Sequence, residues 1–147
     1  MIWKPHATVA AVIEKDGRFL MVEEESDGLI VFNQPAGHLD PDESLIQAVI
    51  RETREETAWR FFPEAITGIY RWKQPDTERT FLRIAFCGHV DDLDSGQILD
   101  EGIIRAVWMS RDQLISNQQQ LRSPMVLHCI DDYLANKRYP LELLTDI

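Results

Sequence analysis

Apolar runs separated by short polar turns predict β-strands at the start of the chain. Residues 7–14 and 18–24 are rich in small, branched and bulky apolar side chains, with an Asp-Gly pair at 16–17 between them. Asp-Gly between two apolar runs is typical of a β-hairpin. Residues 29–32 predict a third, short strand, and the polar segment 33–38 predicts a fixed loop that leads into the next element.

The spacing of apolar residues changes to that of a helix over residues 41–57. At about 100° per residue, one face of this segment collects its apolar side chains, which we expect to pack against the core. These core-facing residues are Leu45, Ile46, Val49, Ile50 and Thr53. Asp40 precedes Pro41 and lies three positions before Glu43, which is the pattern of a helix start with a capping box. We therefore expect the helix to begin at Pro41.

The second half of the chain predicts further strands and then short helices. The expected strands are 65–72, 80–90 and 103–109, the expected helices are 110–115 and 123–135, and the tail 138–147 is expected to be extended. Strands before and after a central helix, with a last helix to cover the second face, predict an α/β sandwich. This pattern alone leaves several α+β folds open.

Three glutamates lie together beside the apolar face of the 41–57 helix. Glu52, Glu55 and Glu56 stand three and four positions apart, so their side chains are neighbours on the helix surface. Like charges at this spacing repel, and the C-terminal half of a helix disfavours anions. The arrangement suits a site where hard divalent cations bind carboxylate oxygens together with substrate phosphates. A solvated acidic face is the alternative that the three acids alone leave open.

The residues around these acids resemble the Nudix box, G-x5-E-x7-R-E-U-x-E-E-x-G-U, in which U is a bulky apolar residue. The positions in register are Gly37, Glu43, Arg51, Glu52, Glu55 and Glu56. Three positions depart from the pattern, because Thr53, Ala58 and Trp59 stand where it has U, Gly and U. Thr53 is close to Val in shape, and its hydroxyl can bond a carbonyl one turn back. Ala58 in a left-handed helix end would cost about 1–2 kcal/mol.

The resemblance implies a fold, a reaction and a cofactor. Members of the family are α/β/α sandwiches around a mixed sheet, and we expect residues 1–147 to form one such domain. They hydrolyse phosphoanhydrides by metal-assisted attack of water, so we expect Mg²⁺ as the cofactor, with Mn²⁺ as an alternative ion. The expected metal ligands are Glu52, Glu55, Glu56 and, from family precedent, the backbone carbonyl of Gly37.

Roles for the neighbouring residues follow with less support from the sequence. Arg51 is expected to orient a ligating carboxylate. Glu43 is either a helix cap or the salt-bridge partner of Arg51. The general base of the family is a box glutamate or an acid on a distant loop. Asp100 and Glu101 are the distant candidates here, and family position favours Glu101, although a solvated loop pair is the alternative.

Three residues are candidates for contact with the substrate. His38 directly follows Gly37 and is therefore the best placed to touch phosphates. Arg83 is a second phosphate candidate, and an ordinary surface charge is the alternative for it. Trp72, at a predicted strand end beside a polar loop, could stack on a ring of the substrate.

Charge and composition limit the classes of partner that we expect the protein to bind. The net charge of −10 over 147 residues argues against a nucleic-acid backbone as the partner. It would also repel a phosphorylated substrate, unless bound cations invert the local potential, so metal dependence is expected. The chain lacks a run of eighteen apolar residues and a signal-peptide pattern, and Cys87 and Cys129 lie in apolar segments. We expect no membrane span, reduced thiols, a cytoplasmic location and, by default, a monomer.

Segments outside the box resemble one branch of the family. They are residues 3–6, 32–38, 121–124 and 138–142. Members of that branch remove single phosphates from nucleoside tri- and diphosphates and hydrolyse pyrophosphates such as hydroxymethylpyrimidine or thiamine pyrophosphate. Orthophosphate release is therefore the expected activity. The alternatives are a Nudix pyrophosphatase for dinucleoside polyphosphates or housecleaning nucleotides, and a non-catalytic domain that binds a nucleotide or a partner.

Overall fold

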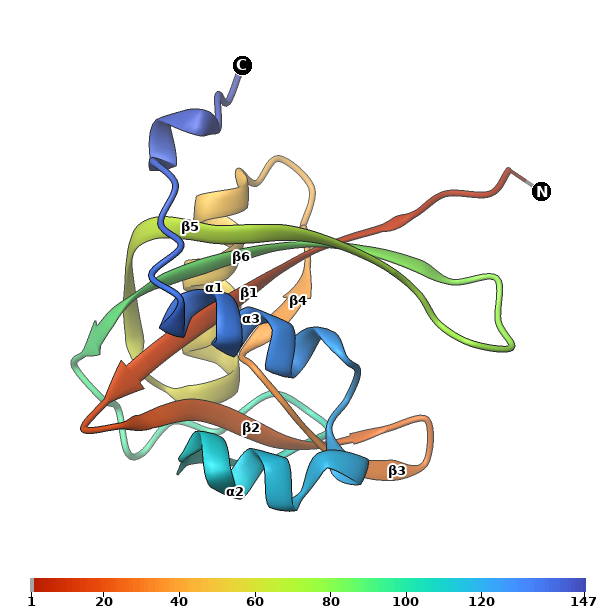
Figure 1. The fold of residues 1–147 in the computed structure, drawn as a ribbon. Helices are drawn as coiled ribbons and strands as arrows, with labels where there is room; N and C mark the ends of the chain where they lie inside the picture. Colours follow the sequence, from red (N-terminus) through yellow and green to blue (C-terminus); the bar gives the residue numbers. More distant parts are fainter. Residues whose placement is uncertain (1) are drawn as a thin grey trace.

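Seven strands form the mixed sheet of the computed structural model, which describes residues 2–147 (Figure 1). The strands are β1 (His6–Lys15), β2 (Arg18–Ser26), β3 (Leu29–Asn33), β4 (Ala36–His38), β5 (Arg60–Lys73), β6 (Thr80–Asp91) and β7 (Ile103–Met109). Their main order is β3-β2-β1-β6-β5, while β4 pairs with β1 and β7 pairs with β2. The sheet is mixed because β1 and β6 are parallel and the other pairs are antiparallel.

The predicted hairpin at the start of the chain is confirmed. Asp16 and Gly17 both adopt positive φ angles, 53° and 77°, between β1 and β2. A two-residue turn with positive φ at both positions matches the right-handed twist of the flanking strands. It brings Lys15 opposite Arg18 in the ladder.

Helices cover the two faces of the sheet, as predicted. They are α1 (Leu45–Thr57), α2 (Arg111–Ser116) and α3 (Met125–Leu134). Residues of β1 alternate between two buried clusters, with Val9 facing the cluster that contains Val49 of α1 and Val12 facing the one that contains Ile130 of α3. Figure 1 shows α1 (yellow) behind the strands and α3 (blue) in front of them. The expected α/β/α sandwich around a mixed sheet is therefore confirmed.

The start of α1 was predicted wrongly. The helix begins at Leu45, and Ser44 is its cap. Ser44 and Gln47 form a complete capping box, in which each side chain accepts a hydrogen bond from the other residue's backbone N–H. Asp42 has a φ of 62°, which a right-handed helix does not allow, so the helix cannot begin at Pro41.

Other boundaries also differ from the prediction. β5 begins at Arg60, before the predicted start at 65, and the three-residue strand β4 was not predicted. The tail is not wholly extended, because Tyr139 pairs with Ile66 and a 3-10 turn follows at Leu141–Leu143. Within residues 2–147, none of the helices is both long and apolar enough to span a membrane.

Candidate active site

Strand β4 and helix α1 meet at Gly37. A side chain on Gly37 would overlap the carboxylate of Glu52. One turn further along α1, the Oε1 atom of Glu56 accepts a hydrogen bond of 2.9 Å from the backbone N–H of Ala36. The strand backbone therefore runs directly along the acidic side of the helix, and a side chain at position 37 would displace the Glu52 carboxylate.

Arg51 lies among the carboxylates of this region. Its guanidinium donates to both oxygens of Glu43, at 2.6 and 2.9 Å. It also donates to Glu52 at 2.9 Å and to Glu55 at 3.2 Å. A fifth hydrogen bond, of 3.0 Å, reaches the backbone carbonyl of His38. One cation thus fixes three acidic side chains and the end of β4, which is an arrangement suited to orienting carboxylates.

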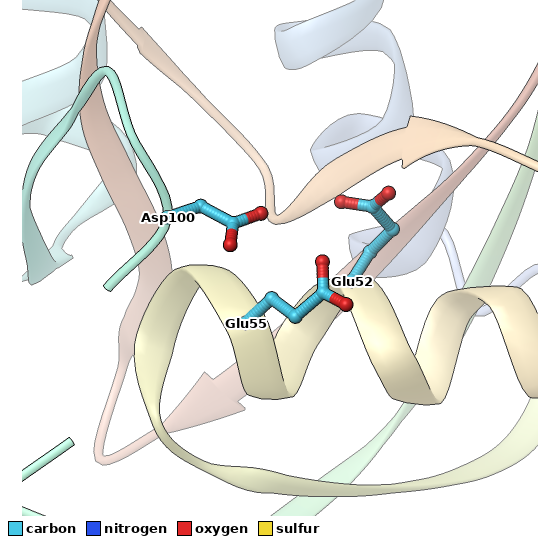
Figure 2. Close-up of side chains that lie close together, drawn as sticks. All are labelled: Glu52, Glu55 and Asp100. Carbon is cyan, nitrogen blue, oxygen red and sulfur yellow. The ribbon is translucent and has the colours of Figure 1, made fainter. Parts of the chain in front are cut away.

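Asp100 joins two of the box glutamates. Oxygen atoms of Glu52, Glu55 and Asp100 lie within 4.8 Å of one another, and their side chains point toward a common space (Figure 2). Asp100 comes from the connection between β6 and β7, so two distant parts of the chain form this acidic group. Glu101, which the sequence favoured, is exposed and is not a member of it. Glu56 is also outside the group and is 7% exposed.

Burial raises the pKa values of the α1 glutamates. Burial outweighs the contact with Arg51 and raises the pKa of Glu52 to about 7. Burial and the adjacent Asp100 carboxyl raise the pKa of Glu55, and burial raises that of Glu56 well above its ordinary value. Gathering these groups without a compensating cation is costly. An all-oxygen set of donors at this distance suits a hard divalent ion, so these residues could hold Mg²⁺ or Mn²⁺.

A cavity of about 230 Å³ is connected to the acidic group through Gly37, which lines the cavity and lies against Glu52, while Glu52, Glu55 and Asp100 are not part of its lining. Its lining includes Gly37 and all three predicted substrate contacts, His38, Trp72 and Arg83. The Trp72 ring stacks on that of Phe81, with centroids 5.9 Å apart and an interplanar angle of 25°. The cavity therefore offers an aromatic wall next to carboxylates that could hold a metal.

Arg83 differs from the surface charge that the sequence also allowed. It is only 4% exposed, and its guanidinium donates to the side-chain oxygens of Gln34 at 2.8 Å and Asn33 at 3.1 Å. Gln34 in turn donates to the carbonyl of Val126 on α3 at 2.8 Å. Arg83 therefore fixes the side-chain amides of Asn33, which lines the cavity, and of Gln34.

His38 lies against a second histidine. Its Nε2 atom is 3.2 Å from Nδ1 of His6, and the ring of His6 stacks on Phe81 with centroids 5.2 Å apart. Burial and the proximity of His6 lower the pKa of His38, which favours its neutral form.

The three departures from the box pattern are accommodated locally. The Thr53 hydroxyl donates to the carbonyl of Val49 at 2.8 Å, one turn back. Ala58 adopts the left-handed conformation, with a φ of 64°, where the pattern has Gly. Trp59 packs edge-to-face on Trp108, with centroids 6.1 Å apart. The helix end therefore keeps the geometry of the box at the cost of strain in Ala58.

The comparisons with known proteins identify the class. Residues 4–129 match the family described as NUDIX domain. The chain belongs to the Nudix family, and it is a hydrolase that acts on phosphorus-containing anhydrides.

Its relatives include a named phosphatase. The chain is 39% identical to phosphatase NudJ of Escherichia coli (strain K12) over 145 residues, which is 99% of this chain and 94% of that protein. A solved NUDIX hydrolase from Nitrosomonas europaea is 50% identical, with a TM-score of 0.96 over 98% of both chains. The MutT protein from Methanosarcina mazei Go1 is 26% identical, with a TM-score of 0.73 over 94% of this chain and 100% of that one. The expected resemblance to one branch of the family, that of phosphatase NudJ, is therefore confirmed over nearly the whole chain.

Proposed function

We propose that this protein is a Mg²⁺-dependent phosphatase that releases orthophosphate from nucleoside tri- and diphosphates. Hydroxymethylpyrimidine pyrophosphate and thiamine pyrophosphate are further candidate substrates. The similarity to phosphatase NudJ over 99% of this chain carries the proposal. Mn²⁺ is the alternative ion. We further propose that residues 1–147 act as one domain, as a monomer, in the cytoplasm.

The proposed metal ligands are Glu52, Glu55, Glu56 and the carbonyl of Gly37. For Gly37 and Glu56 the support is the close approach of β4 to α1, which includes the hydrogen bond from Ala36 N–H to Glu56. For Glu52 and Glu55 it is the clustering of their carboxylate oxygens with those of Asp100 within 4.8 Å. Divalent ions bound there would neutralise phosphate oxygens and lower the pKa of a water molecule. Arg51 would hold Glu52 and Glu55 in the orientation that such ions require.

The proposed reaction also requires a general base, which is a carboxylate that accepts the proton of the attacking water. Glu101 is the candidate that family position suggests, and a box glutamate is another. Asp100 is better placed than Glu101, because its carboxylate lies with those of Glu52 and Glu55. Asp100 is therefore placed either to accept this proton or to bind the ion together with Glu52 and Glu55.

The cavity beside the acidic group is the proposed substrate site. Trp72 would stack on the base or other ring of the substrate, and His38 would approach the phosphates as a neutral hydrogen-bonding group. Arg83 would act on the substrate by fixing Asn33, since both residues line the cavity and are bonded to each other.

The test is an assay of Mg²⁺-dependent product release over a small panel. The panel contains several nucleoside tri- and diphosphates, a dinucleoside polyphosphate and hydroxymethylpyrimidine pyrophosphate, with orthophosphate and pyrophosphate measured separately. Orthophosphate that is lost in Glu56→Gln supports the proposal. Pyrophosphate or nucleoside monophosphate as the product would contradict it in favour of a Nudix pyrophosphatase. Binding without turnover of any substrate would favour a binding domain.

A further inference from the structure

The connection between β6 and β7 is attached to the C-terminal end of α1. The last turn of a helix leaves carbonyl groups without partners inside the helix. Here, three carbonyls at the end of α1 accept hydrogen bonds from this connection, and one of them, Arg54 O, also accepts from the backbone N–H of Ala58. The pairs are Asp94 N to Ala58 O at 3.0 Å, Gln97 Nε2 to Arg54 O at 2.6 Å, and Asp100 N to Glu55 O at 3.0 Å.

Arg54 makes this attachment from both its backbone and its side chain. Its carbonyl accepts from Gln97, while its Nη1 atom donates to Ala58 O at 2.9 Å and to Asp92 O at 2.7 Å. The guanidinium therefore bonds one carbonyl of the helix end and one of the connection. A positive charge at this position also complements the negative end of the helix dipole. We call residues 92–100, with these bonds to α1, the latched loop.

The latched loop ends at the acidic group. The backbone N–H of Asp100 donates to the carbonyl of Glu55, and the carbonyl of Asp100 accepts from Ile103 N at 3.0 Å. Both bonds fix the backbone of Asp100, while its side chain points toward those of Glu52 and Glu55 (Figure 2). The place of this carboxylate therefore depends on how the loop is held against α1.

We infer that Arg54 is a positioning residue of the metal site, which acts by holding the latched loop so that Asp100 completes the group with Glu52 and Glu55. This inference rests on the proposed function, because it assumes that the group binds a divalent ion. Arg54 does not belong to the acidic group, and its guanidinium bonds backbone carbonyls, so its effect passes through Asp100.

The direction in which Arg54→Met changes the Mn²⁺ affinity distinguishes this positioning role from a simple effect of charge. Arg54→Met removes a positive charge near a cation site, which by electrostatics alone would strengthen cation binding. If Arg54 positions Asp100 through the latched loop, we expect the opposite result. Mn²⁺ should bind about 10-fold more weakly, as is usual when a residue that supports a metal ligand is lost. Mn²⁺ affinity is measured without substrate, by paramagnetic resonance or calorimetry. Arg60→Met is the matched control, because Arg60 pairs with Asp91 on the exposed side of the same region.

A double-mutant cycle tests whether Arg54 works through Asp100. Asp100→Asn should weaken Mn²⁺ binding, and adding Arg54→Met to it should change the affinity little further. Gln97→Leu removes a different bond of the latch and should give a loss of the same sign as Arg54→Met. It serves as the second probe if Arg54→Met does not fold, as judged by circular dichroism.

Three outcomes would overturn the inference. Unchanged or tighter Mn²⁺ binding in folded Arg54→Met and Gln97→Leu would show that the latch does not support the site. Additive losses in the double mutant would show that Arg54 acts independently of Asp100. Absence of Mn²⁺ binding by the unmodified protein would remove the metal site itself, and would thus contradict the proposed function as well.

Discussion

Gly37 and Glu52 lie so close together that a side chain at position 37 would displace the Glu52 carboxylate. Neither element can easily move away from the other. Gly37 pairs with Val9 in the sheet, and α1 buries Ala48 and Val49 against the same core. The contact is therefore set by the packing of the fold and not by a flexible loop.

Gly37→Ala should displace the Glu52 carboxylate and impair activity while the fold survives. A displacement of about 1 Å at a catalytic group can lower the rate by about 10²-fold, and we expect a loss of that order in kcat/KM. Steady-state kinetics measure the effect, and circular dichroism checks the fold. The displaced carboxylate should also bind Mn²⁺ more weakly, and adding Glu52→Asp, which shortens the side chain, should restore part of that affinity. Full activity in Gly37→Ala would contradict the steric explanation.

Glu43→Gln should weaken the site without touching its ligands. Glu43 accepts two hydrogen bonds from Arg51, and that contact, stronger than the opposing effect of burial, lowers the pKa of Glu43. With a neutral amide there, the hold of Arg51 on Glu52 and Glu55 loosens. We expect a loss of about 10-fold, either in the metal affinity or in kcat measured at saturating metal. The KM for the substrate should change little. Glu64→Gln, in an exposed pair with His89, is the control. A loss confined to substrate KM would refute this role.

Trp72→Ala should affect substrates with a ring and spare those without one. Stacking on an aromatic side chain contributes about 1–3 kcal/mol per base, so KM for nucleotides should rise by at least several-fold. Hydrolysis of inorganic tripolyphosphate, which has no ring, should be unchanged. Equal losses for both substrates would show that Trp72 supports the structure and does not contact a ring.

The pair of Tyr70 and Asp132 predicts a pH-dependent stability. Tyr70 donates to Asp132 at 2.7 Å, and Lys137 lies 3.0 Å from the same carboxylate. Burial would raise the pKa of Asp132, but these contacts outweigh it and lower the pKa below its ordinary value. The stabilisation is therefore complete above the unfolded pKa of about 4 and is lost as the pH falls through the lower, folded pKa.

Tyr70→Phe should accordingly lower the free energy of unfolding by about 1–2 kcal/mol at pH 7. The difference from the unmodified protein should shrink at an acidic pH below the lowered, folded pKa of Asp132, where this carboxyl is protonated in both states. Urea unfolding at the two pH values measures this change. Tyr139→Phe, at an exposed position, is the control. A difference that does not depend on pH would show that the lost contact is not with the ionised carboxylate.

Local patterns in the sequence predicted most of the strands and helices in their order along the chain, although not β4, and they singled out the box residues as candidates for the site. The Asp-Gly hairpin and the register of the box residues are examples. The start of α1 was less predictable, since two capping patterns overlap there. Glu43, which was expected to belong to the cap, accepts a hydrogen bond from Arg51, about two helical turns further on. The cap is instead formed by Ser44 with Gln47.

The placement of Asp100 and Arg83 depends on contacts between distant segments. Asp100 and Glu101 are neighbours in a connection without periodicity, and the bond from Asp100 to the Glu55 carbonyl decides which of them faces α1. Arg83 was expected as a phosphate contact, but its burial follows from the pairing of β6 with β1 and the approach of Gln34. The pattern of residues along the chain does not show that Asp100 will contact Glu55 or that Arg83 will contact Gln34.

The parallel pairing of β1 with β6 has a consequence for how the site comes into being. Strand β1, near the beginning of the chain, must pair with β6, from its second half, before the connection that carries Asp100 is in place. Contacts of such long sequence separation form slowly, because the intervening chain must first be ordered. The acidic group is therefore expected to assemble late in folding. A peptide that contains the whole box would carry the motif and still lack the site.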